Sequence, residues 1–169
     1  AVDPNFECGT CRACKRGWAH LCESLGAYGV TVHGGFAELS LIDATNVHPI
    51  GDMSFLQAAL AEPMGCVLNG LDAVHGPWME EALIFGAGPM GLLMGLALKS
   101  EGVANVTFCD ISDERLELAS TFGFDAIASA SDALGTWHHR ADLVVEATGV
   151  PSVASNPNNY ITNRGRGLF

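Results

Sequence analysis

The six residues GAGPMG, from Gly86 to Gly91, constrain the fold of this chain more than any other stretch. They match the pattern G-x-G-x-x-G and lie between a short apolar run, Ala82–Phe85, and a segment with the composition of a helix, Pro89–Lys99. A lone match to this pattern is weak evidence, but a strand before it and a helix after it are typical of a βαβ unit that binds a dinucleotide.

Each position of this turn has an expected role. Gly86 permits the tight turn, Gly88 lets a pyrophosphate approach the backbone, and Gly91 lets the helix and strand pack closely. Pro89 suits the first turn of a helix, and Met90 lies beside it, where free N–H groups and the positive end of the helix dipole attract phosphate. We therefore expect all five residues to contribute to a cofactor site.

The residues after this turn continue to alternate between strand and helix patterns. Strands are expected at Asn105–Cys109 and Asp142–Ala147, a shorter one at Asp125–Ala128, and a helix at Asp113–Thr121. Such alternation indicates an α/β fold with a parallel sheet of the Rossmann type. The residues after Val150 are polar and rich in Asn, Gly and Arg, and their pattern assigns no fold.

Asp110 directly follows the strand expected at Asn105–Cys109, nineteen residues after Gly91. An acidic residue at about this distance is expected to bind the adenosine ribose hydroxyls, and its charge would repel a 2′-phosphate, so the sequence favours NAD over NADP. Arg115, one turn later, is expected to cover the adenine. The alternative is that Asp110 only caps the next helix.

Four of the six cysteines lie close together, in the spacing C-x2-C-x2-C-x7-C: Cys8, Cys11, Cys14 and Cys22. This spacing favours a zinc ion, and a zinc ion with four thiolate ligands has a closed, structural site. An iron–sulfur cluster is the main rival, although ferredoxin-type sequences continue x3-C-P and here Glu23 follows the last cysteine. Disulfides are the third possibility, and they are disfavoured because the start of the chain does not resemble a signal peptide.

The first part of the chain has weaker patterns. Short strands are expected within Gly34–Ile50, and Ser54 is expected to cap a helix over Phe55–Ala61. Pro63 interrupts that pattern, and a second helix is expected to run to about His75.

The charge balance limits the possible partners. The 169 residues carry 8 Lys and Arg against 19 Asp and Glu, a net charge of −11, which argues against nucleic-acid binding. No apolar run reaches the roughly 18 residues of a membrane span. We expect a cytoplasmic protein with no membrane association, and the missing initiator Met suggests a fragment.

Together these motifs resemble the zinc-dependent medium-chain dehydrogenase/reductases, from Val2 to about Val150. The resemblance rests on the cysteine loop, on GAGPMG, and on GGFAEL, AEPMGC and EATG at Gly34–Leu39, Ala61–Cys66 and Glu146–Gly149. It is strongest to the polyol branch, which includes sorbitol, arabinitol and threonine dehydrogenases. The resemblance implies two incomplete domains: a β-rich, GroES-like catalytic domain with a structural-zinc lobe at 1–63, and an NAD-binding Rossmann domain at 64–169.

The resemblance also implies roles for single residues. The four cysteines would hold the structural zinc, Thr148 would join the cofactor-binding residues, and Glu62 would lie next to the catalytic zinc, as a ligand or through water. Read without the family, Glu62 is either a buried carboxylate that needs a cation or a helix N-terminal residue stabilised by the dipole. The family's other catalytic ligands, a Cys and a His-Glu pair, are expected upstream of Ala1.

The expected function is therefore that of the central part of a dehydrogenase that transfers a hydride from a secondary alcohol or sugar alcohol to NAD. The full-length enzyme is expected to be a homo-oligomer. Two alternatives remain: a zinc- and nucleotide-binding module without activity, and an iron–sulfur electron-transfer module. Cys66 and Cys109 lie in apolar surroundings and are expected to be inert, buried thiols.

Overall fold

The computed structural model describes residues 1–74, 76–155 and 157–169. Contacts within the chain divide it into two compact units, Ala1–Ala61 and Glu62–Phe169, which are described separately. This division lies close to the sequence-based boundary after residue 63, whose assignment to two domains stays a prediction. Among the described residues, no helix is long and apolar enough to cross a membrane.

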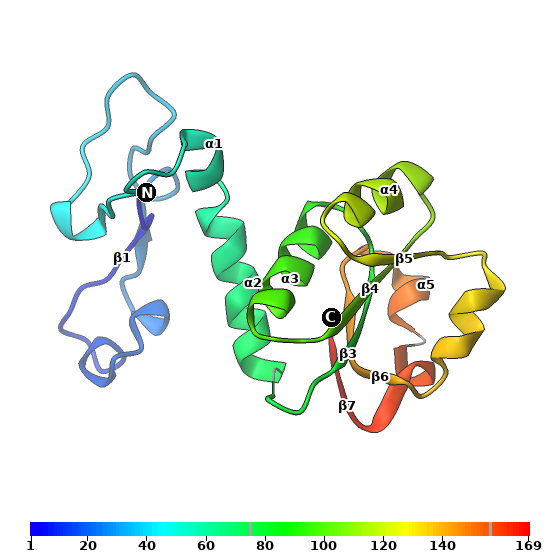
Figure 1. Cartoon of the computed structure of the whole chain (residues 1–169). Coiled ribbons are helices and arrows are strands. Elements are labelled where there is room, and N and C mark those ends of the chain that lie inside the picture. The colour runs from blue at the N-terminus through cyan, green and yellow to red at the C-terminus, as the bar shows by residue number, and fades with distance from the viewer. Residues whose placement is uncertain (75, 156) are drawn as a thin grey trace. The chain divides into compact units, whose positions relative to one another are not determined.

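The first unit contains little regular structure (Figure 1). Its two short strands pair antiparallel, with Asn5 opposite Ala27 and Phe6 opposite Gly26. Its elements are β1 (Asn5–Phe6), β2 (Gly26–Ala27), three 3-10 turns (Cys14–Arg16, Ala19–Leu21, Ala44–Asn46) and α1 (Phe55–Ala58). Cys22 is the one buried hydrophobic residue among its described residues, so this unit has almost no apolar core.

The predicted helix cap at Ser54 is confirmed. The Ser54 hydroxyl accepts a hydrogen bond from the Gln57 N–H, and the Gln57 side chain accepts one from the Ser54 N–H, which is a complete capping box. The helix ends at Ala58 rather than Ala61. The next helix, α2 (Ala61–Val74), contains Pro63 in its first turn, where a missing N–H costs nothing. His75, the predicted end of this helix, lies outside the described residues.

The prediction of short strands within Gly34–Ile50 is wrong. In the described residues this segment is irregular apart from a 3-10 turn and one isolated bridge between Val2 and Val47. The apolar side chains of Phe36, Leu39 and Leu41 are almost fully exposed. A strand requires a hydrogen-bonded neighbour, and no described residue pairs with 34–46 to form one.

The second unit is built on a five-stranded parallel sheet with the order β5-β4-β3-β6-β7. The strands are β3 (Glu81–Phe85), β4 (Asn105–Asp110), β5 (Asp125–Ala128), β6 (Ala141–Glu146) and β7 (Ile161–Leu168). The connections include α3 (Pro89–Ser100), α4 (Asp113–Thr121), a 3-10 turn (Asp132–Trp137) and α5 (Pro151–Ala154). The predicted Rossmann-type α/β architecture is thereby confirmed.

Alternating side chains of the strands build a core on each face of the sheet. Ile84 and its neighbours contact α2, α3 and α4 on one face, whereas Leu83 belongs to a second cluster with Trp137. Both residues are completely buried, as expected for a parallel sheet covered on both faces. Figure 1 shows these helices beside the sheet.

The strand order reverses at β3, because the chain first adds β4 and β5 on one side of it and then β6 and β7 on the other. Such a switch point leaves a crevice outside the carboxyl ends of the strands. The fifth strand, β7, includes the sequence RGRGL, and its register against β6 shifts between Ala141 and Leu143. The tail to which the sequence pattern assigned no fold thus forms a strand at one edge of the described sheet.

Candidate functional site

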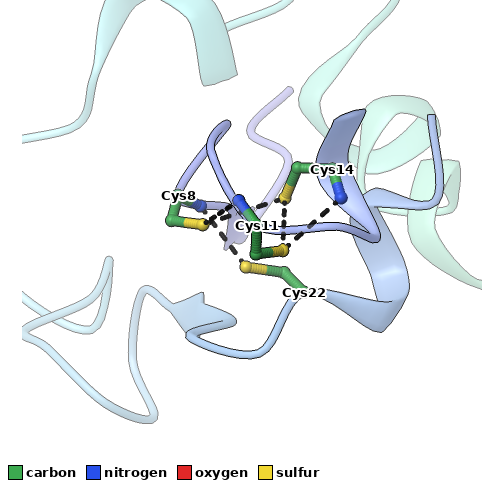
Figure 2. Close-up of side chains that lie close together, drawn as sticks. All are labelled: Cys8, Cys11, Cys14 and Cys22. Carbon is green, nitrogen blue, oxygen red and sulfur yellow. Dashed lines mark hydrogen bonds between the residues drawn. The ribbon is translucent and has the colours of Figure 1, made fainter. Parts of the chain in front are cut away.

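The sulfurs of Cys8, Cys11, Cys14 and Cys22 lie within 4.8 Å of one another. Figure 2 shows the four side chains converging on one point, with 3.4 Å between the Cys11 and Cys14 sulfurs and 4.0 Å between those of Cys8 and Cys14. Zinc bound tetrahedrally at about 2.3 Å from each sulfur places the sulfurs about 3.8 Å apart. The observed spacing therefore fits a single tetrahedral ion.

Backbone N–H groups aim at these sulfurs. The Cys8 N–H donates to the Cys22 sulfur at 3.4 Å, the Cys11 N–H to the Cys8 sulfur at 3.4 Å, and the Ser24 N–H to the Cys22 sulfur at 3.3 Å. Gly17 ends the first 3-10 turn in the left-handed conformation, with a φ of 77°, and turns the chain back toward Cys22. Donors directed at sulfur stabilise thiolates, the form that binds metals.

The geometry also bears on the two rival interpretations. All four cysteines are free thiols, and the Cys11 and Cys14 sulfurs, 3.4 Å apart, are much farther from each other than the two sulfurs of a disulfide bond, at about 2.05 Å. A multi-iron cluster divides its cysteine ligands among several irons and so spreads the sulfurs farther than one ion does. A single ion is the better fit.

The thiols differ in acidity because their surroundings differ. The Thr10 hydroxyl and nearby N–H groups lower the pKa of Cys8 to about 6. Burial and the neighbouring Cys11 thiol raise the pKa of Cys14 to about 12. Four thiolates cannot gather without a cation, and the exposed side chains of Arg12 and Lys15 flank the loop. A divalent ion supplies the missing charge, so these residues can hold a structural zinc.

The second candidate site is a cleft of about 370 Å³ at the carboxyl ends of β3, β4, β5 and β6. It therefore lies at the switch point of the sheet, where open α/β folds bind their ligands. The cleft brings together five of the eight predicted cofactor residues: Gly86, Gly88, Asp110, Arg115 and Thr148. The other three, Pro89, Met90 and Gly91, lie in the first turn of α3.

The three glycines of the turn are required for different reasons. Gly86 has a φ of 100°, and a Cβ on Gly91 would lie 1.9 Å from the Gly86 carbonyl oxygen. The fold alone therefore requires glycine at both positions. A Cβ on Gly88 would meet nothing within 4 Å. The space in front of Gly88 is therefore left open by the protein, at the N-terminus of α3, where a pyrophosphate fits.

Asp110 is buried at the floor of the cleft, with a side chain that is 5% exposed. Its Oδ2 accepts the Ala87 N–H at 2.7 Å, and its Oδ1 accepts the Ser112 N–H at 2.9 Å. Burial by itself raises the pKa of this carboxyl, but the N–H donors and the Arg115 guanidinium outweigh it and lower the pKa below its ordinary value. Asp110 is thus charged at neutral pH.

The alternative role of Asp110 as the cap of the next helix is wrong. Ser112 caps α4, because its hydroxyl accepts the Arg115 N–H at 3.4 Å. The Arg115 guanidinium lies 3.9 Å from Asp110 Oδ2 and is 59% exposed at the rim of the cleft. The Asp110 carboxylate is therefore free to accept further hydrogen bonds from a ligand.

Glu62 lies in the first turn of α2, where the helix dipole stabilises a negative charge. The sequence left open a buried carboxylate at this position, but the residue is exposed. The Cys66 thiol donates to Glu62 Oε1 at 3.5 Å, and this hydrogen bond raises the pKa of Cys66. Cys66, expected to be buried, is also exposed, whereas Cys109 is buried as expected.

Sequence patterns missed several residues of the cleft. Ser129 follows β5 directly, so the predicted strand at Asp125–Ala128 already indicated that it reaches this edge. Val150 and Val153 line the cleft from the segment after β6, which carried no pattern that placed it.

Comparisons with known proteins find relatives along almost the whole chain. Residues 1–52 match the family model of the alcohol dehydrogenase GroES-like domain. The chain is 45% identical to D-altritol 5-dehydrogenase of Agrobacterium fabrum over 99% of its length, and 35% identical to D-arabinitol dehydrogenase 1 of Uromyces fabae over 96%. It covers 51% and 50% of these proteins, so the chain spans about half the length of the curated relatives it matches.

Solved structures show the same similarity. An Escherichia coli CFT073 alcohol dehydrogenase complexed with NADH matches 99% of this chain with a TM-score of 0.82 and 30% identity, over 52% of its own length. Galactitol-1-phosphate dehydrogenase from Escherichia coli matches 99% with a TM-score of 0.81 and 28% identity, over 51% of its own length. The chain belongs to the zinc-dependent medium-chain dehydrogenase/reductase family.

Proposed function

We propose that this chain is the central part of an NAD-dependent, zinc-containing dehydrogenase that oxidises a sugar alcohol or another secondary alcohol. The observation that carries this proposal is the cleft at the switch point, with open space in front of Gly88 and a charged, buried Asp110. In the complete enzyme, a bound catalytic zinc would supply Lewis-acid activation of the alcohol, and NAD would be the hydride acceptor.

The residues of the cleft bind and orient the dinucleotide. Each Asp110 oxygen accepts one backbone N–H and keeps lone pairs for the two hydroxyls of the adenosine ribose. The same negative charge, buried in the cleft, disfavours a 2′-phosphate, so NAD is preferred to NADP. Arg115 lies beside this carboxylate and covers the adenine, while the first turn of α3 directs N–H groups at the pyrophosphate.

The four-cysteine centre braces the first unit. This unit has almost no apolar core, and its two strands are only two residues long. A metal bound by four thiolates leaves no open coordination position, so we assign it a structural role.

The relatives guide the choice of substrate. Two relatives, which are 45% and 35% identical to this chain over the aligned residues, are named for sugar alcohols, altritol and arabinitol. We therefore propose a polyol as substrate. We place the enzyme in the cytoplasm, where four free thiols remain reduced, and expect a homo-oligomer of the complete protein.

Metal analysis and calorimetry test this proposal on the purified chain. We expect one zinc per chain with no iron or sulfide, and NAD binding at least about ten-fold tighter than NADP binding. Cysteines joined as disulfides, an iron–sulfur chromophore, or a chain that binds neither dinucleotide would contradict it.

A second candidate function is a zinc- and nucleotide-binding module that does not turn over. The observation in its favour is that the Glu62 carboxylate accepts a hydrogen bond from Cys66, and that the described residues contain no second cluster of metal-binding groups. Assays with NAD, D-altritol, D-arabinitol and added zinc distinguish the two candidates. A second bound zinc together with NADH formation would show that the chain completes a catalytic site by itself.

A further inference from the structure

One wall of the dinucleotide cleft is the short turn that follows β6. Glu146 is the last residue of that strand, and its carboxylate accepts hydrogen bonds from three donors of the turn. Oε1 accepts the Thr148 N–H at 2.6 Å and also the Thr148 hydroxyl. Oε2 accepts the Gly149 N–H at 3.3 Å. A single carboxylate therefore holds the whole turn.

The Thr148 hydroxyl is fully engaged within this turn. It donates its only hydrogen to Glu146 and accepts the Val150 N–H at 3.0 Å. A hydroxyl has one hydrogen to donate, so Thr148 has none left for a ligand in the cleft. What Thr148 offers the cofactor is the position of its backbone and methyl group.

This turn also packs directly on the glycine-rich loop. A Cβ on Gly86 would lie 2.9 Å from the carbonyl group of Ala147 and 3.1 Å from the Thr148 methyl carbon. Gly149 has a φ of 69°, a conformation that must be held by its surroundings. A small movement of the turn therefore changes the space above Gly86 and the width of the cleft.

We propose that Glu146 is a positioning residue for the dinucleotide, and that it acts through Thr148 and Gly149. This inference rests on the proposed function, because it assigns the wall of the NAD cleft to Glu146. The carboxylate shapes the wall before NAD arrives, so the protein does not reorganise the turn on binding.

Three variants and one control test the proposal by calorimetry of NAD binding. Glu146→Gln places an NH₂ group against one of the donors, and we expect NAD binding to weaken about ten-fold. Thr148→Val keeps the shape but removes the hydroxyl, and we expect a comparable loss. The double variant should bind no more weakly than the worse single variant, since both changes break the same contact.

The control is Asp142→Asn, at the opposite end of the same strand. The Asp142 carboxylate also accepts two backbone N–H groups, from Glu80 at 2.9 Å and Glu81 at 3.1 Å, but it lies outside the cleft. We expect this variant to lose stability while its NAD affinity stays within about two-fold of wild type. A general loss of rigidity would instead lower NAD affinity in all variants alike.

The outcomes separate the inference from the function. Wild-type NAD affinity in a folded Glu146→Gln variant, or multiplicative losses in the double variant, would refute the role of Glu146 alone. We expect hydrogen exchange at the Thr148 and Gly149 amides to be faster in Glu146→Gln than in Asp142→Asn. If the wild-type chain does not bind NAD, both the proposed function and the role of Glu146 in NAD binding are refuted. If amide exchange in Glu146→Gln is unchanged from wild type, the claim that Glu146 holds the turn is refuted whatever the chain binds.

Discussion

Replacement of single glycines in the turn after β3 separates what the fold requires from what the cofactor requires. In Gly91→Ala, the new methyl carbon would lie 1.9 Å from the Gly86 carbonyl oxygen. Carbon and oxygen that are not bonded stay at least about 3 Å apart, so the two backbones must separate by about 1 Å. Because neither atom belongs to a flexible side chain, the strain cannot be relieved by a rotamer change.

The magnitude follows from the cost of overpacking. Forced insertion of a methyl group into a packed interior costs about 1–3 kcal/mol, and a rigid backbone contact places Gly91→Ala at about 3 kcal/mol. The free energy of unfolding of a whole domain is only about 5–15 kcal/mol, so this loss is a large fraction of its stability. We also expect NAD binding to fail, because the first turn of α3 is displaced.

Gly88→Ala is the matched variant. Its methyl group meets no protein atom within 4 Å, and the φ of −77° suits alanine. Alanine is the poorer helix cap but restricts the unfolded chain, and these effects of opposite sign, each below about 1 kcal/mol, nearly cancel. The methyl group occupies the space assigned to the pyrophosphate, so NAD affinity should fall about 10- to 100-fold with little change in stability.

Urea unfolding followed by circular dichroism measures the stability of both variants, and calorimetry measures NAD binding. The reasoning is refuted if Gly91→Ala is as stable as wild type, since the clash would then not exist. It is equally refuted if Gly88→Ala binds NAD as tightly as wild type, because the open space would then not belong to the cofactor.

Three further predictions concern the metal, pH and one ion pair. Removal of zinc by a chelator, or Cys14→Ser, should unfold the first unit while the sheet of the second unit remains folded. Limited proteolysis should then cut the first unit faster, and an equal rate of cleavage with and without metal would contradict this prediction. Asp110→Asn leaves one backbone N–H without an acceptor and should lower the free energy of unfolding by about 2 kcal/mol at pH 7. Folding lowers the pKa of Asp110, so the charged carboxylate contributes to stability above its ordinary pKa of 3.8, and this contribution is lost as the pH falls below that value. Urea titrations at low pH should therefore show the free energies of unfolding of wild type and Asp110→Asn converging. Arg140→Lys loses the two hydrogen bonds to Glu81 and the stacking on Trp137 and should cost about 1 kcal/mol; an unchanged urea midpoint would exclude that contribution.

The sequence predicted the sheet of the second unit well because its strands are buried on both faces. β4 and β6 were each placed within one residue, since runs such as Leu143–Val145 are entirely apolar and need no partner to be recognised. β7 was missed as a full strand, because its polar, glycine-rich residues have low strand propensity and are held by pairing with β6.

The first unit was predicted less well for the opposite reason. Strands within Gly34–Ile50 were inferred from apolar residues such as Phe36 and Leu39, yet apolar character does not create a hydrogen-bonded neighbour. Two local signals succeeded there: the Ser54 cap, and the cysteine spacing, because a tight turn directs successive sulfurs to one point whatever the rest of the unit does.

The two carboxylates beside β3 show which part of a site a sequence can reveal. Asp110 was found because a carboxylate in its proposed ligand role lies at a fixed distance from the glycines, and that spacing is visible in the sequence alone. Glu146 acts on a turn two residues away, and its importance appears only when that turn is seen against Gly86.

Both carboxylates accept hydrogen bonds from the backbone of neighbouring turns: Asp110 from the Ala87 N–H and Glu146 from the Gly149 N–H. Among the described residues, every buried side-chain nitrogen and oxygen has a partner. The cleft is thus shaped by satisfied contacts on both sides of β3, and the free N–H groups of α3 and the space before Gly88 remain for the ligand. A site arranged in this way binds with little ordering cost, which is the physical reason to assign it to a dinucleotide and not to packing.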